Sequence, residues 1–386
     1  MASSAPKTAV IFLTGSLRLG GTERNILHLA TGLDPRRFAV EVWSDYEGEP
    51  VQQEIRARGI PCTALKGAHS LGRPLVERVF RHNLPYQRRL YGMLRERREA
   101  VVHAFGFPMI YHAVLLGRLA GCRRVVYAVQ DWDVWKRSGV YSGLDRLCSR
   151  LAACAVADGD GARRLAIRRQ GMAPERIATI YDGVDVDGLR PTRTIEETRR
   201  SMGLTPDRTT VGMIARLDVR KKGQDVFLRA IERIGPACGA QFVIIGDGPD
   251  RRQIEEMASR LPDSIRPALP GARSDLADAL AALDVLVIPS RWESVPKILM
   301  EGMWLHRPVI ATDVGDIPEI LDPTCGVLTK ANDADGLARA MAALIPDAPL
   351  RERLGAAAHE RIECRGLTLA GSIAKYVELY ETLARN

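Results

Sequence analysis

Residues 285–304 read VLVIPSRWESVPKILMEGMW, and this stretch is the most informative about the fold of the second half of the chain. Residues 285–289 are continuously apolar, which is typical of a strand buried on both faces of a parallel sheet. Pro296 suits the first turn of a helix, where its missing N–H costs nothing. The stretch therefore predicts a strand, a turn and a helix, which is the repeating unit of parallel α/β folds.

The same stretch carries groups that could bind a nucleotide. At the start of the predicted helix, the free N–H groups of Lys297 and Ile298 point toward the strand ends, where an anion can sit. Glu301 lies about one and a half turns into the helix, and a carboxylate there could accept both hydroxyls of a ribose. Glu293 precedes it by eight residues. Taken alone, two glutamates at this spacing favour the simpler alternative, an amphipathic helix with solvent-facing acids.

Apolar strands alternate with amphipathic stretches along the whole chain, which predicts parallel sheets with helices on both faces. The length of 386 residues favours two domains. We therefore expect an α/β fold with two Rossmann-like domains that face each other across a cleft, at 1–185 and 186–365, and a C-terminal helix at 366–386 that packs back on the first domain. The expected strands are 9–13, 38–43, 101–104, 125–129, 153–157, 177–180, 210–214, 241–245, 285–289, 308–311 and 326–328.

Basic residues follow the predicted strand 210–214. Arg216 lies at its carboxyl end, where open α/β sheets bind ligands, and Lys222 follows shortly before the next helix. An arginine and a lysine at one strand end suit a diphosphate, whose charge must be neutralised as the bond breaks. The alternative is a solvated basic loop, because Arg220 and Lys221 lie there too.

Glycines mark two further strand ends. Gly246 and Gly248 follow the strand 241–245 and would allow the backbone to approach a ligand, although a plain tight turn explains them equally well. The segment from Gly271 to Arg273 precedes another helix. Its backbone could pair with a base edge, and Arg273 could stack on the ring. All these segments fall at the carboxyl edge of one sheet, and their convergence predicts a nucleotide pocket.

In the first half, Gly20 and Gly21 lie between the first strand and the first helix and suggest a loop that approaches phosphate. Neither a G-x-G-x-x-G fingerprint nor the lysine and serine of a P-loop accompanies them. This argues against a dinucleotide oxidoreductase or a nucleoside triphosphatase.

Composition indicates the class of partner. The net charge of +8 and the pI near 9.2 indicate anionic partners, such as nucleotide sugars or phospholipid surfaces, whereas no motif for nucleic acid is present. The sequence shows no signal peptide or spanning segment, so we expect a cytoplasmic protein. The seven cysteines form no C-x-x-C pair and are expected to be buried apolar residues.

The stretch 73–99 is rich in arginine, with apolar residues interleaved. It predicts a basic amphipathic helical region interrupted near Pro85. Its apolar side either packs on the first domain, leaving the arginines as a solvated face, or docks on an anionic membrane from the cytoplasmic side.

The chain as a whole resembles retaining glycosyltransferases of the GT-B fold, specifically glycosyltransferase family 4, also called glycosyl transferases group 1. The matching motifs are specific in the second half and looser in the first. They are Gly20-Gly21-Thr22-Glu23-Arg24, Asp182-Gly183-Val184-Asp185, Arg216-Leu217-Asp218 with Lys222-Gly223, Ile245-Gly246-Asp247-Gly248-Pro249, Pro289-Ser290-Arg291-Trp292-Glu293 running to Glu301-Gly302-Met303, and residues 308–315.

The resemblance implies a hexosyltransferase of polysaccharide or glycolipid biosynthesis that moves a sugar, with retention, from a nucleotide-diphosphate sugar to an acceptor. It implies no metal and no cofactor. Arg216, Lys222 and Glu293 would be the catalytic residues. The donor would be bound by Gly20, Gly21, Gly246, Gly248, Gly271, Arg273, Ser294, Val295, Pro296, Lys297, Ile298 and Glu301.

Two features depart from the family. Many members carry a histidine at the end of the fifth strand of the first domain, where this chain has Gln130 and Asp131. Gln130 could hydrogen-bond a sugar hydroxyl but cannot take up a proton at neutral pH, and His103 is a further candidate contact to sugar or acceptor. Ser294 and Val295 stand where a glycine and an aromatic residue are common, which leaves the donor sugar open.

Two other classes of protein share this fold. One is a different enzyme, such as a nucleotide-sugar epimerase, and the other is a nucleotide-sugar-binding protein without turnover. The combination of Glu293 and Glu301 with Arg216 and Lys222 favours the transferase.

Overall fold

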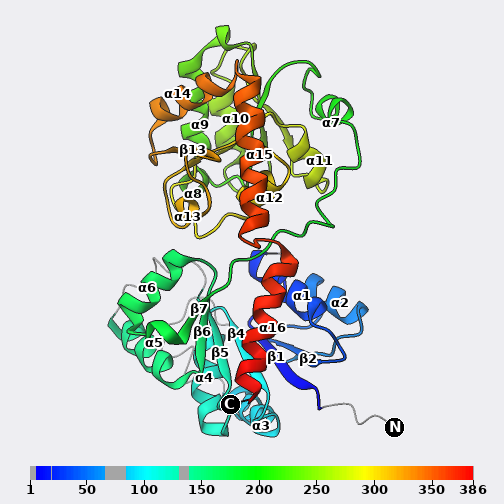
Figure 1. The fold of residues 1–386 in the computed structure, drawn as a ribbon, viewed down its shortest axis with the longest axis vertical. Coiled ribbons are helices and arrows are strands. Elements are labelled where there is room, and N and C mark those ends of the chain that lie inside the picture. Colours follow the sequence, from blue (N-terminus) through cyan, green and yellow to red (C-terminus); the bar gives the residue numbers. More distant parts are fainter. Residues whose placement is uncertain (1–5, 19, 66–83, 130–138, 386) are drawn as a thin grey trace. The chain divides into compact units, whose positions relative to one another are not determined.

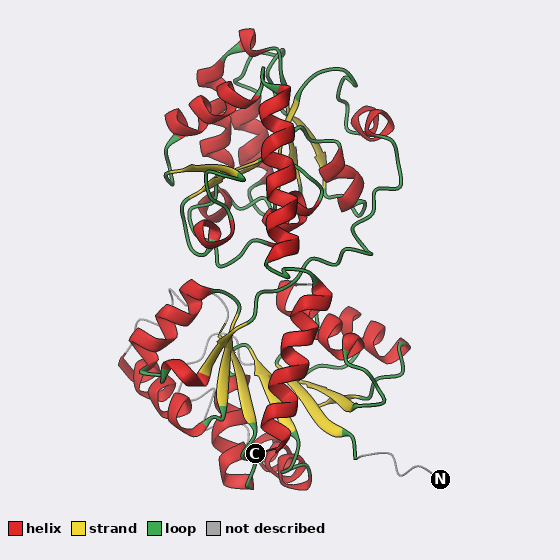
Figure 2. Cartoon of the chain, in the orientation of Figure 1, coloured by secondary structure: helices red, strands yellow, loops and turns green. Residues whose placement is uncertain are grey.

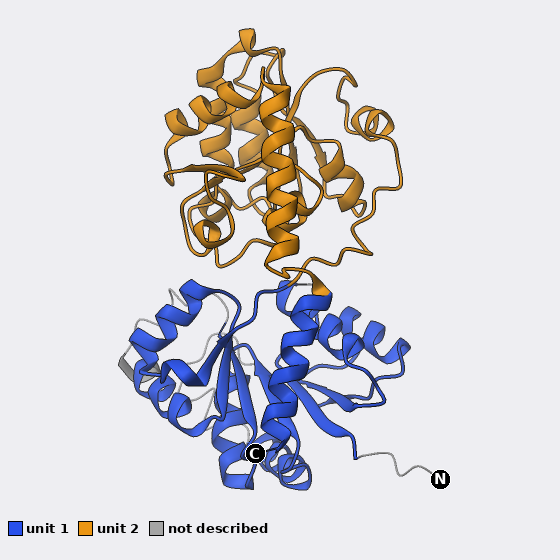
Figure 3. Ribbon diagram, viewed as in Figure 1, with its two compact units in different colours: residues 1–182, 370–386 blue, residues 183–369 orange. Residues whose placement is uncertain are grey.

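The computed structural model describes residues 6–18, 20–65, 84–129 and 139–385 and divides into two compact units (Figure 3). Unit 1 comprises Met1–Asp182 and Ala370–Asn386, and unit 2 comprises Gly183–Leu369. Almost all of the C-terminal helix α16 (Leu369–Arg385) therefore belongs to the unit that the N-terminal half of the chain forms.

In the described part of unit 1, seven parallel strands form one sheet in the order β3-β2-β1-β4-β5-β6-β7 (Figures 1 and 2). The central strands are buried along their whole length because helices cover both faces, which explains why their residues are apolar except for His103. The strands are β1 (Thr8–Thr14), β2 (Phe38–Ser44), β3 (Cys62–Ala64), β4 (Val101–Phe105), β5 (Val125–Val129), β6 (Cys154–Ala157) and β7 (Ile177–Thr179).

Two apolar layers flank this sheet. One lies between the sheet and helices α3 to α6, and the other lies between the sheet and helices α1, α2 and α16, with Tyr376 and Tyr380 of α16 packed near Phe12 of β1. The helices are α1 (Gly21–Gly32), α2 (Pro50–Ala57), α3 (Leu84–Glu96), α4 (Met109–Ala120), α5 (Gly139–Leu151) and α6 (Asp160–Gln170), with a 3-10 turn at Pro174–Arg176.

Unit 2, which is described throughout, contains a six-stranded parallel sheet in the order β10-β9-β8-β11-β12-β13. The strands are β8 (Thr210–Ile214), β9 (Gln241–Ile245), β10 (Ala268–Gly271), β11 (Val285–Ile288), β12 (Val309–Thr312) and β13 (Gly326–Thr329). The helices are α7 (Ile195–Ser201), α8 (Val219–Lys222), α9 (Gln224–Ile234), α10 (Arg251–Ala258), α11 (Leu276–Ala281), α12 (Lys297–Trp304), α13 (Ile317–Ile320), α14 (Ala334–Leu344) and α15 (Ala348–Cys364), with a 3-10 turn at Pro236–Cys238.

Every strand expected from the sequence is present, with ends that differ by at most one residue. The sequence did not predict β3 or β10, and both are short strands at a sheet edge. Pro270 lies in β10, and only an edge strand tolerates a residue that cannot donate to the ladder.

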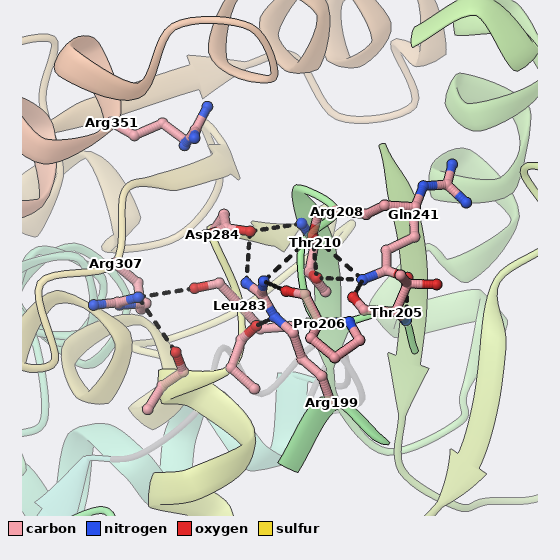
Figure 4. A network of polar contacts seen from close by, with 12 residues as sticks. Arg199, Thr205, Pro206, Arg208, Thr210, Gln241, Leu283, Asp284, Arg307 and Arg351 are labelled. Atoms are coloured by element: carbon pink, nitrogen blue, oxygen red, sulfur yellow. Dashed lines mark hydrogen bonds and ion pairs between the residues drawn. The ribbon is translucent and has the colours of Figure 1, made fainter. Parts of the chain in front are cut away.

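A buried arginine attaches α7 to the sheet of unit 2 (Figure 4). The Nη2 of Arg199 donates to Oδ2 of Asp284 at 2.7 Å, and the backbone N–H of Thr210 donates to the same oxygen at 2.7 Å. Its Nε donates to the carbonyl of Ala282 at 2.9 Å, and its Nη1 to that of Pro206 at 2.6 Å. One guanidinium therefore joins the start of β8, the start of β11 and the loop between α7 and β8.

Only part of the arginine-rich stretch lies in the described region, since residues 73–83 fall outside it. Pro85 lies in the first turn of α3 as described, where a proline is tolerated. Because the residues just before Leu84 lie outside the described region, the interruption expected near Pro85 stays a prediction. Tyr86, Leu90 and Leu94 are buried in the core of unit 1, and the arginines of α3 are exposed. The apolar side of α3 therefore packs on its own domain and is not available to a membrane.

Two further expectations concern the whole chain. Among the described residues, no helix is both long enough and apolar enough to cross a bilayer. Cys122, Cys148, Cys154 and Cys325 are buried as expected, whereas Cys364 is exposed, because it lies on the outer face of the long helix α15.

Candidate functional site

The centre of the candidate site is an ion pair between Lys222 and Glu293 in unit 2. The Nζ of Lys222 lies 2.5 Å from Oε1 of Glu293, and the hydroxyl of Ser290 donates to the same oxygen at 2.7 Å. Glu293 is only 7% exposed, so its carboxylate is held firmly in place. Its other oxygen, Oε2, accepts no hydrogen bond from any residue that the structure describes and is available to a ligand hydroxyl.

The loop after β12 supports the backbone around Glu293. The hydroxyl of Thr312 donates to the carbonyl of Ser290 at 2.5 Å, and the N–H of Asp316 donates to the carbonyl of Ser294 at 3.1 Å. Gly315 has φ +59°, and a Cβ there would lie 1.9 Å from the carbonyl oxygen of Glu293. The sequence did not predict this supporting role for Thr312, Gly315 and Asp316. A glycine just after a strand was the signal available for it.

Arg216 lies two residues beyond the end of β8, at the carboxyl edge of the sheet. Its side chain is exposed, and its guanidinium makes no hydrogen bond or ion pair with any described residue. Its backbone carbonyl accepts a hydrogen bond of 2.9 Å from Nε2 of Gln224, which fixes the loop. The site therefore offers a cation whose charge no described residue neutralises.

Gly246 and Gly248 allow two loops of unit 2 to pack closely together. A Cβ at Gly246 would lie 1.9 Å from the carbonyl oxygen of Ala215, and one at Gly248 would lie 2.3 Å from that of Leu217. The N–H of Leu217 donates to the carbonyl of Asp247 at 3.0 Å. The two glycines therefore let the loop after β9 pack against the loop that carries Arg216, and the close backbone approach they permit is to protein.

The segment around Gly271 ends the edge strand β10. The N–H of Gly246 donates to the carbonyl of Gly271 at 2.9 Å, so that carbonyl is already used within the protein. Arg273 forms a bidentate pair with Asp275, with Nε to Oδ1 at 2.8 Å and Nη2 to Oδ2 at 2.5 Å. The carboxylate engages the guanidinium at its edge and fixes its orientation, which leaves stacking as the mode open to a nucleobase.

The start of α12 carries most of the other donor-binding candidates. Pro296 is the residue before the helix and not part of its first turn, which is a small correction to the sequence prediction. Lys297 and Ile298 are the first two helical residues, and Glu301 follows one turn later, partly exposed. Val295 is partly exposed.

The hydroxyl of Ser294 is buried without a hydrogen-bond partner among the described residues. The residue is 8% exposed, and Oγ has no hydrogen-bond partner among the described residues. A buried hydroxyl without a partner is costly, and such groups are usually completed by water or a ligand. The residue that replaces the common glycine at this position thus brings a polar group to the site.

The loop of Gly20 and Gly21 in unit 1 is occupied by a neighbouring side chain. Gly20 precedes α1, and a Cβ at that position would lie 2.2 Å from Oε2 of Glu23. Partial burial and the nearby charge of Glu49 raise the pKa of Glu23. The carboxylate folds back over the helix start, so a phosphate would have to displace it.

His103 is not placed to contact a sugar or an acceptor. The side chain is fully buried in unit 1, with Nδ1 2.7 Å from the hydroxyl of Tyr380 and the ring close to those of Phe105 and Tyr376. Burial lowers the pKa of His103 to about 3. The sequence placed it correctly in a strand but could not show that α16 covers it. Gln130 and Asp131 lie outside the described residues.

Both halves of the chain match known families. Residues 19–187 match the family described as Glycosyltransferase Family 4, and residues 208–347 match the one described as Glycosyl transferases group 1. The two matches together span both units and contain every candidate residue named above.

Individual relatives and solved structures agree with these matches. D-inositol 3-phosphate glycosyltransferase of Thermobifida fusca is 28% identical over 67% of this chain, which spans only 60% of that relative. Putative glycosyltransferase EpsF of Bacillus subtilis is 25% identical over 81% of this chain and 84% of its own length. Anabaena HepE, crystallised with UDP, superposes with a TM-score of 0.83 at 19% identity, covering 97% of this chain and all of that one. The structural likeness shows a GT-B arrangement of Rossmann-like domains.

Proposed function

The chain belongs to glycosyltransferase family 4, and from this we propose that it transfers a sugar from a nucleotide-diphosphate sugar to an acceptor. The observation that carries the proposal is the grouping at one sheet edge of Lys222 paired with Glu293, the unneutralised Arg216 and the start of α12. The crystal structures of HepE with UDP and with UDP-glucose support a nucleotide sugar as the donor.

In this proposal, the donor lies over the carboxyl ends of β8 and β11. Its diphosphate binds Arg216, Lys222 and the N–H groups at the start of α12, its ribose binds Glu301, and Arg273 stacks on its base. The hydroxyls of the sugar bind Oε2 of Glu293 and Oγ of Ser294, neither of which has a hydrogen-bond partner among the described residues.

The chemistry that follows is a retaining transfer without a metal. As the bond between the anomeric carbon and the phosphate oxygen breaks, negative charge grows on the diphosphate, and the fixed cations stabilise it. The acceptor oxygen attacks from the same face, and a phosphate oxygen takes up its proton, so the configuration is kept. Lys222 and Arg216 supply the charge that a divalent cation would otherwise provide.

We also propose a peripheral contact with an anionic membrane through unit 1. Four successive helices on one face of its sheet each carry arginine in the last turn, and Leu119 beside Arg118 is 73% exposed. Because the apolar side of α3 is buried, charge would dominate this contact. The arginines concerned are Arg88, Arg89 and Arg95 of α3, Arg98 just after it, and Arg118, Arg150, Arg168 and Arg169 of the next three helices.

The test is a thermal-shift panel of UDP-, GDP- and ADP-sugars, because a ligand of the folded state raises its apparent stability. The nucleotide sugar that binds is then incubated with the protein. NMR follows the hydrolysis or transfer of its sugar and the anomeric configuration of the product. We expect a retained configuration and a rate that EDTA does not change. Binding without turnover would favour a binding protein. An inverted product, or a strict need for magnesium or manganese, would contradict the mechanism.

A further inference from the structure

Arg291 makes more polar contacts than any role assigned so far requires. Its Nη1 and Nη2 donate to Oδ1 and Oδ2 of Asp225 at 2.9 and 2.7 Å, which is a bidentate pair. Nη1 also donates to the carbonyl of Val219 at 2.5 Å, and Nε donates to Oδ1 of Asn332 at 2.6 Å. The guanidinium therefore connects the turn after β11 with α8, with the start of α9 and with the loop after β13.

The backbone of the same residue binds α8 a second time. The N–H of Arg291 donates to the carbonyl of Lys221 at 2.8 Å. Helix α8 has only four residues, so its own hydrogen bonds cannot hold it firmly. It ends at Gly223, which has φ +71° and would place a Cβ 2.1 Å from the carbonyl oxygen of Pro289. Two hydrogen bonds of Arg291 and the close packing of Gly223 against Pro289 thus attach α8 to the end of β11.

We propose that Arg291 and Asp225 form a positioning pair that holds Lys222 against Glu293. Lys222 is the last residue of α8, and Glu293 follows Arg291 by two residues. One guanidinium therefore fixes the segments that carry both members of the catalytic ion pair. The effect of this pair on catalysis rests on the proposed function. Its effect on the position of Lys222 is independent of that function.

The side chains of this pair are well suited to a fixed geometry. Arg291 is 21% exposed and Asp225 13% exposed, so water competes weakly for the contact. Lysine would keep the charge but could not bind the carboxylate, the carbonyl of Val219 and Asn332 at once. Asp225 also pairs with Arg229 at 3.0 Å. Its charge therefore keeps a partner when Arg291 is changed, and such variants should fold.

The decisive experiment is a double-mutant cycle on turnover. Arg291→Lys and Asp225→Asn should each lower kcat by about 10- to 100-fold, because small misplacements of catalytic groups have effects of that size. The KM of the donor should change much less. If Arg291 acts through Lys222, the double variant Arg291→Lys with Lys222→Ala should be no slower than Lys222→Ala alone. Multiplied losses in the double variant, or a kcat for Arg291→Lys within about twofold of wild type, would overturn the proposal.

The matched control is Arg229→Gln. Arg229 shares Asp225 with Arg291, but within the described residues no hydrogen bond or ion pair joins it to α8. We expect this variant to keep the wild-type kcat. A loss equal to that of Arg291→Lys would assign the effect to the charge of Asp225 and would also overturn the proposal.

A second measurement separates this inference from the proposed function. Brief acetylation of the folded protein, followed by peptide mass spectrometry, reports the reactivity of the Lys222 amine without any substrate. Loosening α8 should raise the labelling of Lys222 several-fold in Arg291→Lys, while that of Lys375 in α16 stays constant. If the wild type lacks transferase activity but the labelling changes, the proposed function fails and the positioning pair stands. Unchanged labelling would reject the pair.

Discussion

The carbonyl oxygen of Glu293 lies 1.9 Å from the position that a Cβ on Gly315 would occupy. Only glycine lets the turn after β12 close over the backbone of the catalytic segment. The φ of +59° at this position also favours glycine over any residue with a side chain. The position of the Glu293 carboxylate therefore depends on a residue 22 positions away that has no side chain.

We expect Gly315→Ala to destabilise the protein by about 1–3 kcal/mol and to lower turnover, because the backbone of Glu293 must move. Gly203→Ala is the matched control, since Gly203 has φ +74° but no atom within 4 Å of its added Cβ. Urea unfolding and kcat measure both effects. Equal losses in the two variants would show that only backbone strain, and not contact with Glu293, is involved.

Glu301→Ala should weaken binding of the donor by about 1–3 kcal/mol, because the ribose hydroxyls lose their acceptor. Calorimetry with the nucleotide sugar that gives the largest thermal shift measures this. Glu256→Ala serves as the control, since Glu256 is an exposed glutamate of α10 paired with Arg252. Unchanged affinity in a folded Glu301→Ala protein would remove Glu301 from the donor site.

Lys222→Ala and Arg216→Ala should lower kcat more than they weaken donor binding, because charge on the leaving diphosphate grows in the transition state. Lys222→Ala also leaves the buried Glu293 without its cation, so it should cost stability as well. The guanidinium of Arg216 has no hydrogen-bond or ion-pair partner among the described residues, so Arg216→Ala should leave stability unchanged. Steady-state kinetics beside thermal unfolding separate the two effects, and a wild-type kcat in both variants would refute the phosphate assignment.

His103 should make unit 1 sensitive to acid. Burial lowers its pKa to about 3, below the ordinary value of 6.5. Below pH 6.5 the unfolded chain therefore binds a proton at His103 that the folded chain does not bind. The free energy of unfolding falls as the pH drops through 6.5. Between about pH 7 and about pH 5, wild type should lose about 2 kcal/mol more than His103→Gln. Urea titrations at both pH values test this, and parallel losses in the two proteins would mean that His103 is not held neutral.

Changing Arg88, Arg89, Arg95 and Arg98 together to glutamine should reduce co-sedimentation with anionic vesicles at low salt, and salt should release the wild type. A control variant removes the same charge from unit 2, at the exposed residues Arg233, Arg252, Arg260 and Arg339. Equal binding of wild type to neutral and anionic vesicles would rule out the membrane contact. Equal losses in both variants would show that net charge, and not the α3 surface, attracts the protein.

The sequence could identify Arg216, Lys222 and Glu293 as candidates because each lies just beyond an apolar strand. In a parallel sheet the carboxyl ends of neighbouring strands meet at one edge, so residues far apart in the chain are brought together by topology alone. β8 and β11 are neighbours in the sheet, which explains why Lys222 and Glu293 meet. The donor contact of Gly246 and Gly248 stays a prediction, because the sequence cannot tell whether a ligand or another loop approaches a glycine, and the structure shows the approach of a loop.

Apolar periodicity and the positions of glycine and proline are local properties, so the sequence predicted every strand except the edge strands β3 and β10, together with the two-domain α/β fold and the residues at the strand ends. Tertiary packing selects which side chains bind one another. It buried His103 beneath Tyr380 of α16, folded Glu23 over Gly20, and joined Arg291 to Asp225 and the carbonyl of Val219. Except for Glu23 over Gly20, these contacts link residues that are distant in the chain, and their partners are selected by packing geometry, which no local pattern of residue types encodes.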